Sequence, residues 1–383
     1  MAEIITQSKK ARLIFIDVMR GIAVLWMIET HVVDALLLTK YKAGLFYDYL
    51  NISNGMVSVA FLFCAGAGFW LATQRKGDEY RQFKPSFWLY LRRLGFILMM
   101  GYWLHMPVLS FAKLMNLTYT DFIKFMQCDI LQVIVISSLL AVLLLLMIPK
   151  TKILPYIFIA IALGAFYSAP LMLAYEPMKH MPHYIGVFFA TFPVSKFPLL
   201  HWSGYFFAGA ALTAFLYRVE NKRKFAIYAS IGTIITLIVV FFIKSLPFTY
   251  PGYPDWWRCS PGHAIYRTSV VSLAFFFLYL IEDWYKNKKF TQVLVISGQE
   301  SLYLYIFHLM IVYGSIVNPG LKIFVNARLE PMAVIILIIM ICAFCYITAK
   351  VWHRIKEQDS KLAMRVMWTV AILFAAIFMV NPL

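Results

Sequence analysis

The sequence predicts an all-α, polytopic integral membrane helix bundle of about eleven transmembrane helices, and three observations support this fold class. Of the 383 residues, 62% are hydrophobic and 14% are charged, whereas soluble proteins are nearer to roughly one half and one quarter. The apolar residues form runs of about 20, which is the length that crosses ~30 Å of hydrocarbon. Lys and Arg residues gather in short clusters between these runs, as topology signals do.

The apolar runs are the expected spans, and together they make a single transmembrane domain over residues 1–383. In chain order they lie near residues 13–38, 53–74, 88–110, 129–148, 153–174, 199–217, 225–243, 263–283, 291–313, 331–350 and 366–381. The N-terminus and every second loop after it hold 23 Lys and Arg residues, and the opposite loops hold 10. The positive-inside rule therefore predicts a cytoplasmic N-terminus.

The same distribution of residues argues against several other classes. The net charge of +17 does not indicate nucleic-acid binding, because the basic residues follow the expected loops. Cys342 and Cys345 have the spacing of a redox motif but lie inside an apolar run, which favours plain packing. No H-x-x-x-H or H-E-x-x-H pattern occurs, so we expect no metal site.

The first apolar run is unusual because it carries five ionisable residues, Asp17, Arg20, Glu29, His31 and Asp34. Ionisable groups at membrane depth are costly and mark functional sites by default. Asp34 follows His31 by three positions, close enough on a helix to orient its imidazole, so the pair predicts a general base or nucleophile. A packed, hydrogen-bonded helix histidine is the simpler alternative.

Histidines are expected to converge on the outer half of the bundle. A rise of ~1.5 Å per residue puts His31 and His308 about 28 Å from the cytoplasmic edge. His105, His201 and His263 fall in the same outer half of their spans. Each of these has an ordinary interfacial or loop-facing alternative.

Arginines within the expected spans lie near both the outer and the cytoplasmic side of the membrane. Arg267 follows His263 by four residues and shares its helical face. Arg20, Arg92 and Arg93 lie nearer to the cytoplasmic edge, where they would suit an anionic ligand. The alternatives are an intrahelical Asp17–Arg20 pair and arginines that snorkel to the membrane surface.

The first run, read as a motif, resembles the first-helix signature of the transmembrane acyltransferase superfamily. Its matching residues are Arg12, Asp17, Arg20, Gly21, Met27, His31 and Asp34. The branch it most resembles is the heparan-alpha-glucosaminide N-acetyltransferase type with its bacterial relatives. Three weaker stretches agree in order along the chain, and they are Gly66-Ala-Gly68, Asp129-Ile-Leu-Gln132 and Gly298-Gln-Glu-Ser301-Leu-Tyr-Leu-Tyr305-Ile-Phe-His308.

The resemblance implies transfer of an acyl group, commonly acetyl from cytoplasmic acetyl-CoA, to a sugar or glycan on the outer side. His31, with Asp34, would deprotonate the acceptor or take the acyl group itself. Ser301, Tyr305 and His308 would polarise the carbonyl and stabilise the oxyanion. The expected donor-binding residues are Asp17, Arg20, Arg92, Arg93 and Gln132. The expected carbonyl- and acceptor-binding residues are Ser301, Tyr305, His263 and Arg267.

The expected partners follow from this reading: an acyl-CoA donor, a carbohydrate acceptor, the lipid bilayer and no nucleic acid. A bacterial cytoplasmic membrane is the expected location, and a homodimer is compatible with the sequence. A proton-coupled transporter or flippase for a small solute or lipid-linked sugar is the alternative function, because such proteins also need ionisable residues within spans.

Overall fold

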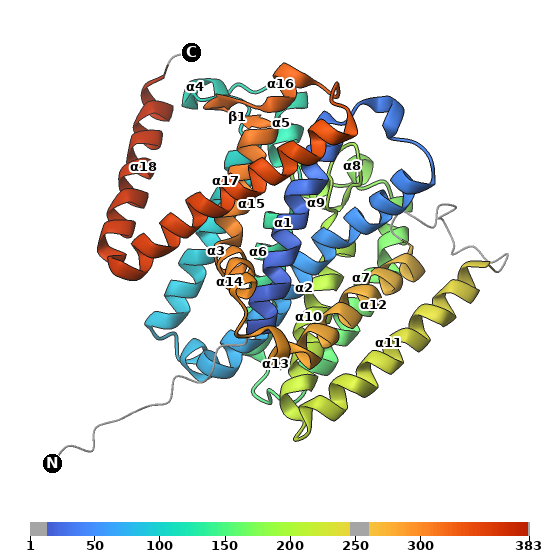
Figure 1. Ribbon diagram of the computed structural model, residues 1–383. Helices are drawn as coiled ribbons and strands as arrows, with labels where there is room; N and C mark the ends of the chain where they lie inside the picture. Colours follow the sequence, from blue (N-terminus) through green and yellow to red (C-terminus); the bar gives the residue numbers. More distant parts are fainter. Residues whose placement is uncertain (1–13, 246–259, 382–383) are drawn as a thin grey trace.

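The computed structural model describes residues 14–245 and 260–381, and almost all of its regular structure is α-helical (Figure 1). The longer helices are α1 (Ile14–Leu36), α2 (Leu45–Arg81), α3 (Pro85–Leu104), α6 (Ile130–Met147), α7 (Leu154–Ala174), α10 (Leu199–Arg218), α11 (Lys222–Ser245), α12 (Pro261–Leu280), α14 (Lys289–Gln299), α15 (Ser301–Val312), α17 (Pro331–Gln358) and α18 (Ser360–Val380). The shorter elements are η1 (Thr39–Tyr41), α4 (Phe111–Leu114), α5 (Tyr119–Met126), α8 (Pro177–His180), α9 (His183–Phe189), α13 (Glu282–Tyr285), α16 (Leu321–Val325) and the antiparallel pair β1 (Gly314–Ser315) and β2 (Asn318–Pro319). Arg12, the first residue of the helix signature, lies outside the described residues.

Long apolar helices confirm the predicted helical membrane bundle. Within the described residues eight helices are long and apolar enough to cross a bilayer, or up to nine if the bent pair α14–α15 makes one span. The 23-residue α1 and the 20-residue α3 have spanning length as well, but charged side chains interrupt their apolar surface. The count of eleven spans and the side of the N-terminus stay predictions.

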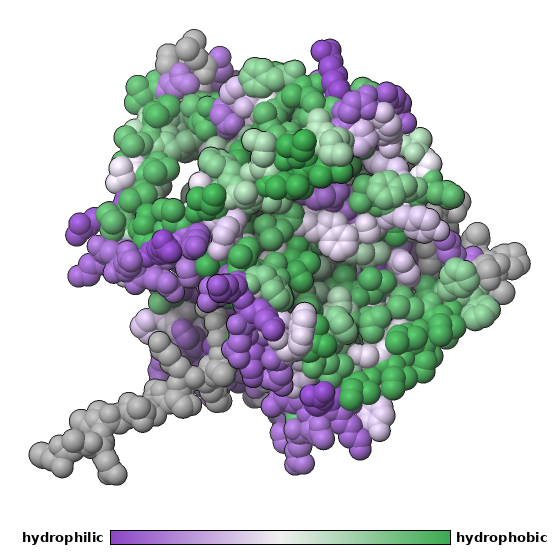
Figure 2. Space-filling model, viewed as in Figure 1, coloured by the Kyte–Doolittle hydropathy of each residue, from purple (hydrophilic) through white to green (hydrophobic). Residues whose placement is uncertain are grey.

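Hydrophobic residues cover a broad part of the surface (Figure 2). On the face shown, hydrophilic residues gather along the lower edge around α13 and the start of α11. Large exposed apolar side chains include Phe241 on α11, Ile339 on α17 and Leu373 on α18. Such a surface suits lipid better than water, because soluble monomers rarely expose apolar patches of this extent.

Helix α1 runs through the centre of the bundle, and a glycine pair lets α14 cross it closely (Figure 1). A Cβ added to Gly21 would collide with the carbonyl oxygen of Leu294 on α14. A Cβ added to Gly298 would collide with the carbonyl oxygen of Asp17 on α1. Small residues allow this close approach of helix backbones, which is how membrane helices gain packing energy.

A second glycine pair joins α2 to α10. Gly66 lies against the carbonyl of Phe206, and Gly209 lies against the carbonyl of Phe63. Gly68, two residues further along α2, instead faces the guanidinium of Arg20, whose Nη2 would lie 3.2 Å from an added Cβ. The small-residue stretch in the second span is therefore used on two sides, for helix packing and for space beside Arg20.

The expected span over residues 291–313 is not one straight helix. It is divided at Glu300 into α14 and α15, whose axes differ by 80°. The carboxylate of Glu300 is buried and pairs with Nδ1 of His353 at 2.8 Å and Nζ of Lys356 at 2.5 Å, both on α17. Buried charge needs such partners, so the ion pairs fix Glu300 where the chain turns.

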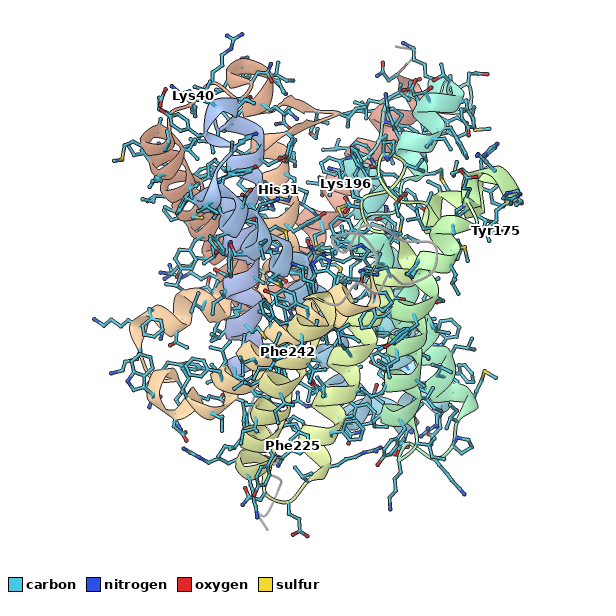
Figure 3. The ribbon with its side chains drawn as sticks, turned by 90° about the vertical axis from the view of Figure 1, so that its right-hand side faces the viewer. His31, Lys40, Tyr175, Lys196, Phe225 and Phe242 are labelled. Atoms are coloured by element: carbon cyan, nitrogen blue, oxygen red, sulfur yellow. The ribbon has the colours of Figure 1, made fainter. Side chains whose placement is uncertain are left out.

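The molecule has two ends, which we name by residues labelled in Figure 3: the Lys40 end and the Phe225 end. The Lys40 end is the expected outer side, and the Phe225 end is the expected cytoplasmic side. The long segment 175–198, expected to hold an interfacial or re-entrant stretch at 184–192, forms only the short helices α8 and α9. Near the end of this segment Ser195 and Pro198 are buried, and Lys196 between them is exposed and lies at the height of His31 (Figure 3).

Candidate active site

Tyr313, the residue that follows α15, connects His31 to Asp34. Its hydroxyl donates a hydrogen bond to Oδ2 of Asp34 at 2.9 Å, and Nδ1 of His31 lies 3.3 Å from the same oxygen. Because the hydroxyl proton is given to the carboxylate, the oxygen accepts from His31, whose proton is thereby assigned to Nδ1. Asp34 therefore orients His31 through Tyr313 and not by the direct contact expected from the sequence.

His308 on α15 is the second imidazole of the site. It is fully buried, and its ring centroid lies 5.3 Å from that of His31. Nδ1 of His308 donates to the backbone carbonyl of Leu304 at 2.7 Å, and a carbonyl can only accept. Nε2 therefore holds the lone pair, and it is buried with no hydrogen-bond partner among the described residues. The predicted convergence of His31 and His308 is confirmed.

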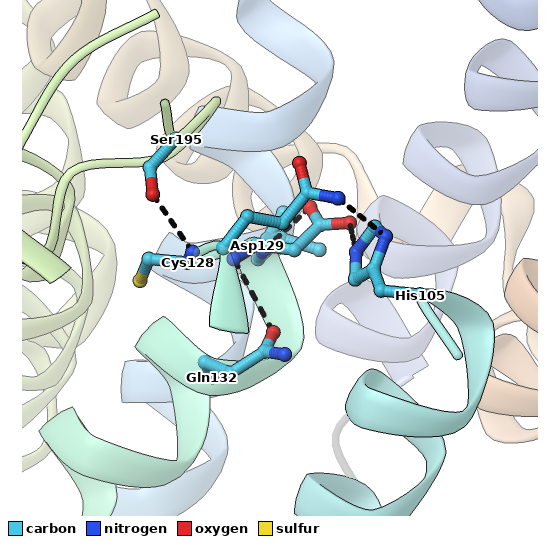
Figure 4. A network of polar contacts seen from close by, with 7 residues as sticks. His105, Cys128, Asp129, Gln132 and Ser195 are labelled. Carbon is cyan, nitrogen blue, oxygen red and sulfur yellow. Dashed lines mark hydrogen bonds and ion pairs between the residues drawn. The ribbon is translucent and has the colours of Figure 1, made fainter. Parts of the chain in front are cut away.

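Tyr305 links these imidazoles to a second polar cluster around Asp129. Its ring meets His308 edge-on at 5.9 Å, and its hydroxyl lies within interaction range of the Asp129 carboxylate. Oδ2 of Asp129 is 2.8 Å from Nε2 of His105, and the side-chain amide of Gln127 donates to Nδ1 of His105 at 2.8 Å (Figure 4). A continuous polar chain therefore leads from α1 through α15 to the start of α6.

Asp129 also begins α6. It is the N-cap residue, its Oδ1 accepts from the backbone N–H of Ile130 at 2.7 Å, and its own N–H donates to Oε1 of Gln132 at 3.3 Å (Figure 4). This reciprocal capping box satisfies backbone donors at the helix start. Gln132 is fully buried, and its Nε2 has no hydrogen-bond partner within the described part of the chain. The expected donor-binding glutamine thus fixes the helix start and retains one free donor.

Arg20 makes structural contacts near the middle of the bundle. Its Nη2 donates to the carbonyl of Cys64 at 3.2 Å, and its Nη1 lies 4.0 Å from Oδ1 of Asp17. An ion pair at that distance is weak, but the carbonyl contact orients the guanidinium. The intrahelical Asp17–Arg20 alternative to anion binding is therefore present in the fold.

The other expected binding residues lie apart from the His31–His308 pair. Arg92 and Arg93 are exposed on α3 and make no ion pair with the described residues. Arg267 on α12 stacks over the ring of Trp202 at 5.9 Å, and His263, one turn away, stacks on Tyr266 at 6.3 Å.

Ser301 is the first residue of α15 and is largely buried. It lies seven residues before His308, about 10 Å along the helix at ~1.5 Å per residue. Within the described ranges no group of three or more His, Cys, Asp and Glu side chains is placed to hold a metal ion.

Two members of the polar chain, Tyr313 and Gln127, were not expected from the sequence. Tyr313 follows His308 by five residues, a spacing without any known role, and Gln127 lies in a loop. The stretch Asp129–Gln132 did carry a sequence signal, but that signal gave no hint of the contact with His105. Proximity across the fold, and not spacing along the chain, brings these side chains together.

A comparison with protein families supports the resemblance seen in the sequence. A family model described as heparan-alpha-glucosaminide N-acetyltransferase, catalytic, matches residues 12–251. That range is more than half of the chain and includes His31, Asp34 and Asp129, while α15 with His308 follows it. No curated protein matches the chain. The chain belongs to the family of heparan-alpha-glucosaminide N-acetyltransferase catalytic domains, a family of membrane acetyltransferases.

Proposed function

We propose that this protein transfers an acetyl group from acetyl-CoA to an amino or hydroxyl group of a sugar or glycan. The observation that carries the proposal is the pair of imidazoles, His31 and His308, whose centroids are 5.3 Å apart. Each ring has its proton assigned to Nδ1 by a hydrogen bond, which leaves the lone pair on Nε2. Membership of an N-acetyltransferase family supplies the reaction class.

His31 is the proposed general base. Its Nε2 takes the proton of the acceptor as the acceptor attacks the thioester carbonyl. The imidazolium that forms is stabilised through its Nδ1–H by Tyr313, and Tyr313 by Asp34. A base held and oriented in this way follows the logic of catalytic triads. The alternative within the same proposal is that His31 accepts the acetyl group before the acceptor does.

His308 is proposed as a second acceptor of protons or of the acetyl group. With Nδ1–H given to Leu304, its Nε2 cannot donate to an oxyanion while the ring is neutral. The sequence-based role of carbonyl polarisation therefore does not suit His308 while its ring is neutral, and the hydroxyl of Tyr305 is already engaged with the Asp129 carboxylate. Ser301, a turn before Tyr305 on α15, is proposed to contact the arm of the donor.

Acetyl-CoA is the proposed donor substrate, and its phosphates need accessible cations. Arg92 and Arg93 fit this role because they are exposed and unpaired within the described residues. Asp17, Arg20 and Gln132 are proposed to line the path of the pantetheine arm, Arg20 with its guanidinium already held by Cys64. His263 and Arg267 are proposed to contact the acceptor from the Lys40 end.

The test is transfer by the purified protein. We expect radiolabelled acetyl-CoA to release CoA and to label an amino sugar or a hydroxyl-bearing glycan. His31→Gln is expected to lower the rate about 10²–10⁴-fold, the usual contribution of a general base. His180→Gln is the matched control, because His180 is an exposed histidine that stacks on Tyr175 away from the site.

Equal rates for wild type and a folded His31→Gln protein would remove His31 from the mechanism. A wild-type protein that uses no acetyl-CoA, but moves a sugar down its gradient into sealed vesicles, would support the transporter alternative. Both outcomes are read from the same preparation reconstituted in lipid.

A further inference from the structure

Lys196 belongs to a loop that is fastened to the start of α6 on both sides of this residue. The hydroxyl of Ser195 accepts from the backbone N–H of Cys128 at 2.9 Å (Figure 4). The same hydroxyl donates to the carbonyl of Val187 at 2.6 Å. The backbone N–H of Phe197 donates to the carbonyl of Cys128 at 3.2 Å. Ser195 is 1% exposed, so this attachment is buried. The backbone of Lys196 is thereby held next to Asp129.

The attachment of Ser195 and Phe197 to Cys128 places Lys196 beside the Asp129 end of the polar chain. Figure 3 shows Lys196 and His31 at the same height, inside the Lys40 end. The ammonium lies within electrostatic range of both His31 and Asp129. It forms no ion pair with a carboxylate of the described residues, although it is exposed. A lysine held at this position, near the Asp129 carboxylate but not paired with it directly, is available to a negative group on a ligand.

The chemistry of acetyl transfer creates such a group. When the acceptor attacks the thioester, a bond forms to the carbonyl carbon and the π electrons move to oxygen. The resulting oxyanion needs a cation or hydrogen-bond donors that are already in place, which is commonly the largest single contribution to such catalysis. In their assigned tautomers, His31 and His308 each have a lone pair on Nε2. Neither ring can therefore donate a hydrogen bond to this oxygen from Nε2 until that nitrogen has taken up a proton.

We propose that Lys196 is a further catalytic residue, whose ammonium stabilises the oxyanion formed on the acetyl group. This role rests on the proposed acetyltransferase function. The acceptor proton goes to Nε2 of His31, and the oxyanion, held by Lys196, re-forms the carbonyl as the carbon–sulfur bond breaks. The CoA thiolate leaves and takes the proton from His31, so that atoms and charge balance. The Ser195 and Phe197 attachments keep the ammonium in position before substrate binds.

The experiment compares Lys196→Met, Lys196→Arg and the control Lys179→Met, each reconstituted in lipid. Lys179 comes from the same loop segment but is paired with Glu176 at 2.7 Å. We expect Lys196→Met to lower kcat about 10²–10³-fold, as removal of one oxyanion-stabilising group does elsewhere. The KM values for acetyl-CoA and acceptor should stay within about threefold of the wild-type values. The reason is that Lys196 would stabilise the oxyanion, which forms during the reaction, and would not bind the substrates before it. Lys196→Arg should recover part of kcat, and Lys179→Met should match wild type.

A covalent rescue separates catalysis from folding. Lys196→Cys, treated with 2-bromoethylamine, regains an ammonium at nearly the original position, and we expect its kcat to rise at least tenfold over the untreated protein. Treated wild type serves as the control for modification of the native cysteines.

Each remaining outcome has a defined meaning. Unchanged kcat in Lys196→Met, a change confined to the acceptor KM, or no rescue of Lys196→Cys would overturn the role of Lys196 while leaving acetyl transfer by wild type intact. A wild type that transfers no acetyl group would overturn the proposed function and this role together.

Discussion

Tyr313 gives the candidate site its most specific residue-level test. Its hydroxyl is hydrogen-bonded both to the carboxylate of Asp34 and to the ring of His31. Tyr313→Phe should lower kcat about 10–100-fold, because His31 would keep its position but lose the partner that fixes its tautomer and stabilises its charged form. Initial rates at saturating acetyl-CoA measure the loss.

Asp34→Asn provides the matching half of a double-mutant cycle. If Asp34 acts through Tyr313, the double variant should lose little more activity than either single one, since residues in one hydrogen-bonded chain are not additive. Losses that multiply would show that Asp34 and Tyr313 act on different steps. Both single variants should lose less activity than His31→Gln, because they remove orientation and leave the base.

At this scale the sequence identified His31, Asp34, His308 and Tyr305 because ionisable and hydroxyl groups inside apolar runs stand out. It could not identify Tyr313, whose role depends on a contact across 279 residues of chain. Lys196 was equally hidden, because a lysine in a polar loop looks like any other surface lysine. Whether these residues act in catalysis stays a prediction until the variants are measured.

The crossing of α1 and α14 is the element on which the geometry of the site depends. Gly298→Ala should destabilise the protein, because the added methyl group would strike the α1 backbone at Asp17 and neither helix can move without disturbing the other. We expect a fall in the melting temperature of the detergent-solubilised protein and a matching loss of activity.

Gly232→Ala on α11 is the control for this substitution. Nothing lies within 4 Å of an added Cβ at Gly232, and alanine is the better helix former by about 1 kcal/mol. Its melting temperature should be equal to or above that of wild type. A Gly298→Ala protein as stable as Gly232→Ala would mean that the α1–α14 crossing is looser than described.

The turn between α14 and α15 predicts a further effect on stability. Lys356→Met removes one of the two α17 partners of the buried Glu300 carboxylate. The cost should be about 1–3 kcal/mol, the range for leaving a buried acceptor short of a partner. Lys361→Met on α18 is the control, since Lys361 is exposed and its hydrogen bond to Asp359 is made by its backbone N–H, which the substitution keeps. Equal melting temperatures for the two variants would contradict this account of the turn.

The sequence predicted the helices well, but it did not predict where a helix is broken. Runs of apolar residues marked most helices to within a few residues, because burial in lipid demands intrahelical hydrogen bonds along the whole run. The break inside 291–313 was missed because Glu300 looks like a single polar residue in an apolar run. Its partners His353 and Lys356 come from a later helix, so the cause of the break is tertiary.

For the whole molecule, composition predicted a membrane protein, because 62% hydrophobic residues leave too little polar surface for a soluble fold, and the apolar runs of about 20 residues predicted helical spans. The family match then narrowed the chemistry to acetyl transfer. The predicted orientation in the membrane rests on a separate observation. Alternate loops hold unequal numbers of Lys and Arg residues, 23 on one side and 10 on the other. That distribution makes a prediction that can be tested without any knowledge of the acceptor's identity.

The prediction concerns the faces from which the two substrates enter. Acetyl-CoA is large and highly charged and does not cross lipid unaided, so it must reach the site from the Phe225 end if that end is cytoplasmic. In sealed proteoliposomes of known orientation, acetyl-CoA at that face should acetylate an acceptor confined to the opposite face, with CoA released on the donor side. Orientation is checked by labelling single cysteines introduced at Lys40 and Lys224. Transfer that needs donor and acceptor on one face would leave an acetyltransferase, but it would contradict the expected division of arginines to the cytoplasmic side and histidines to the outer side.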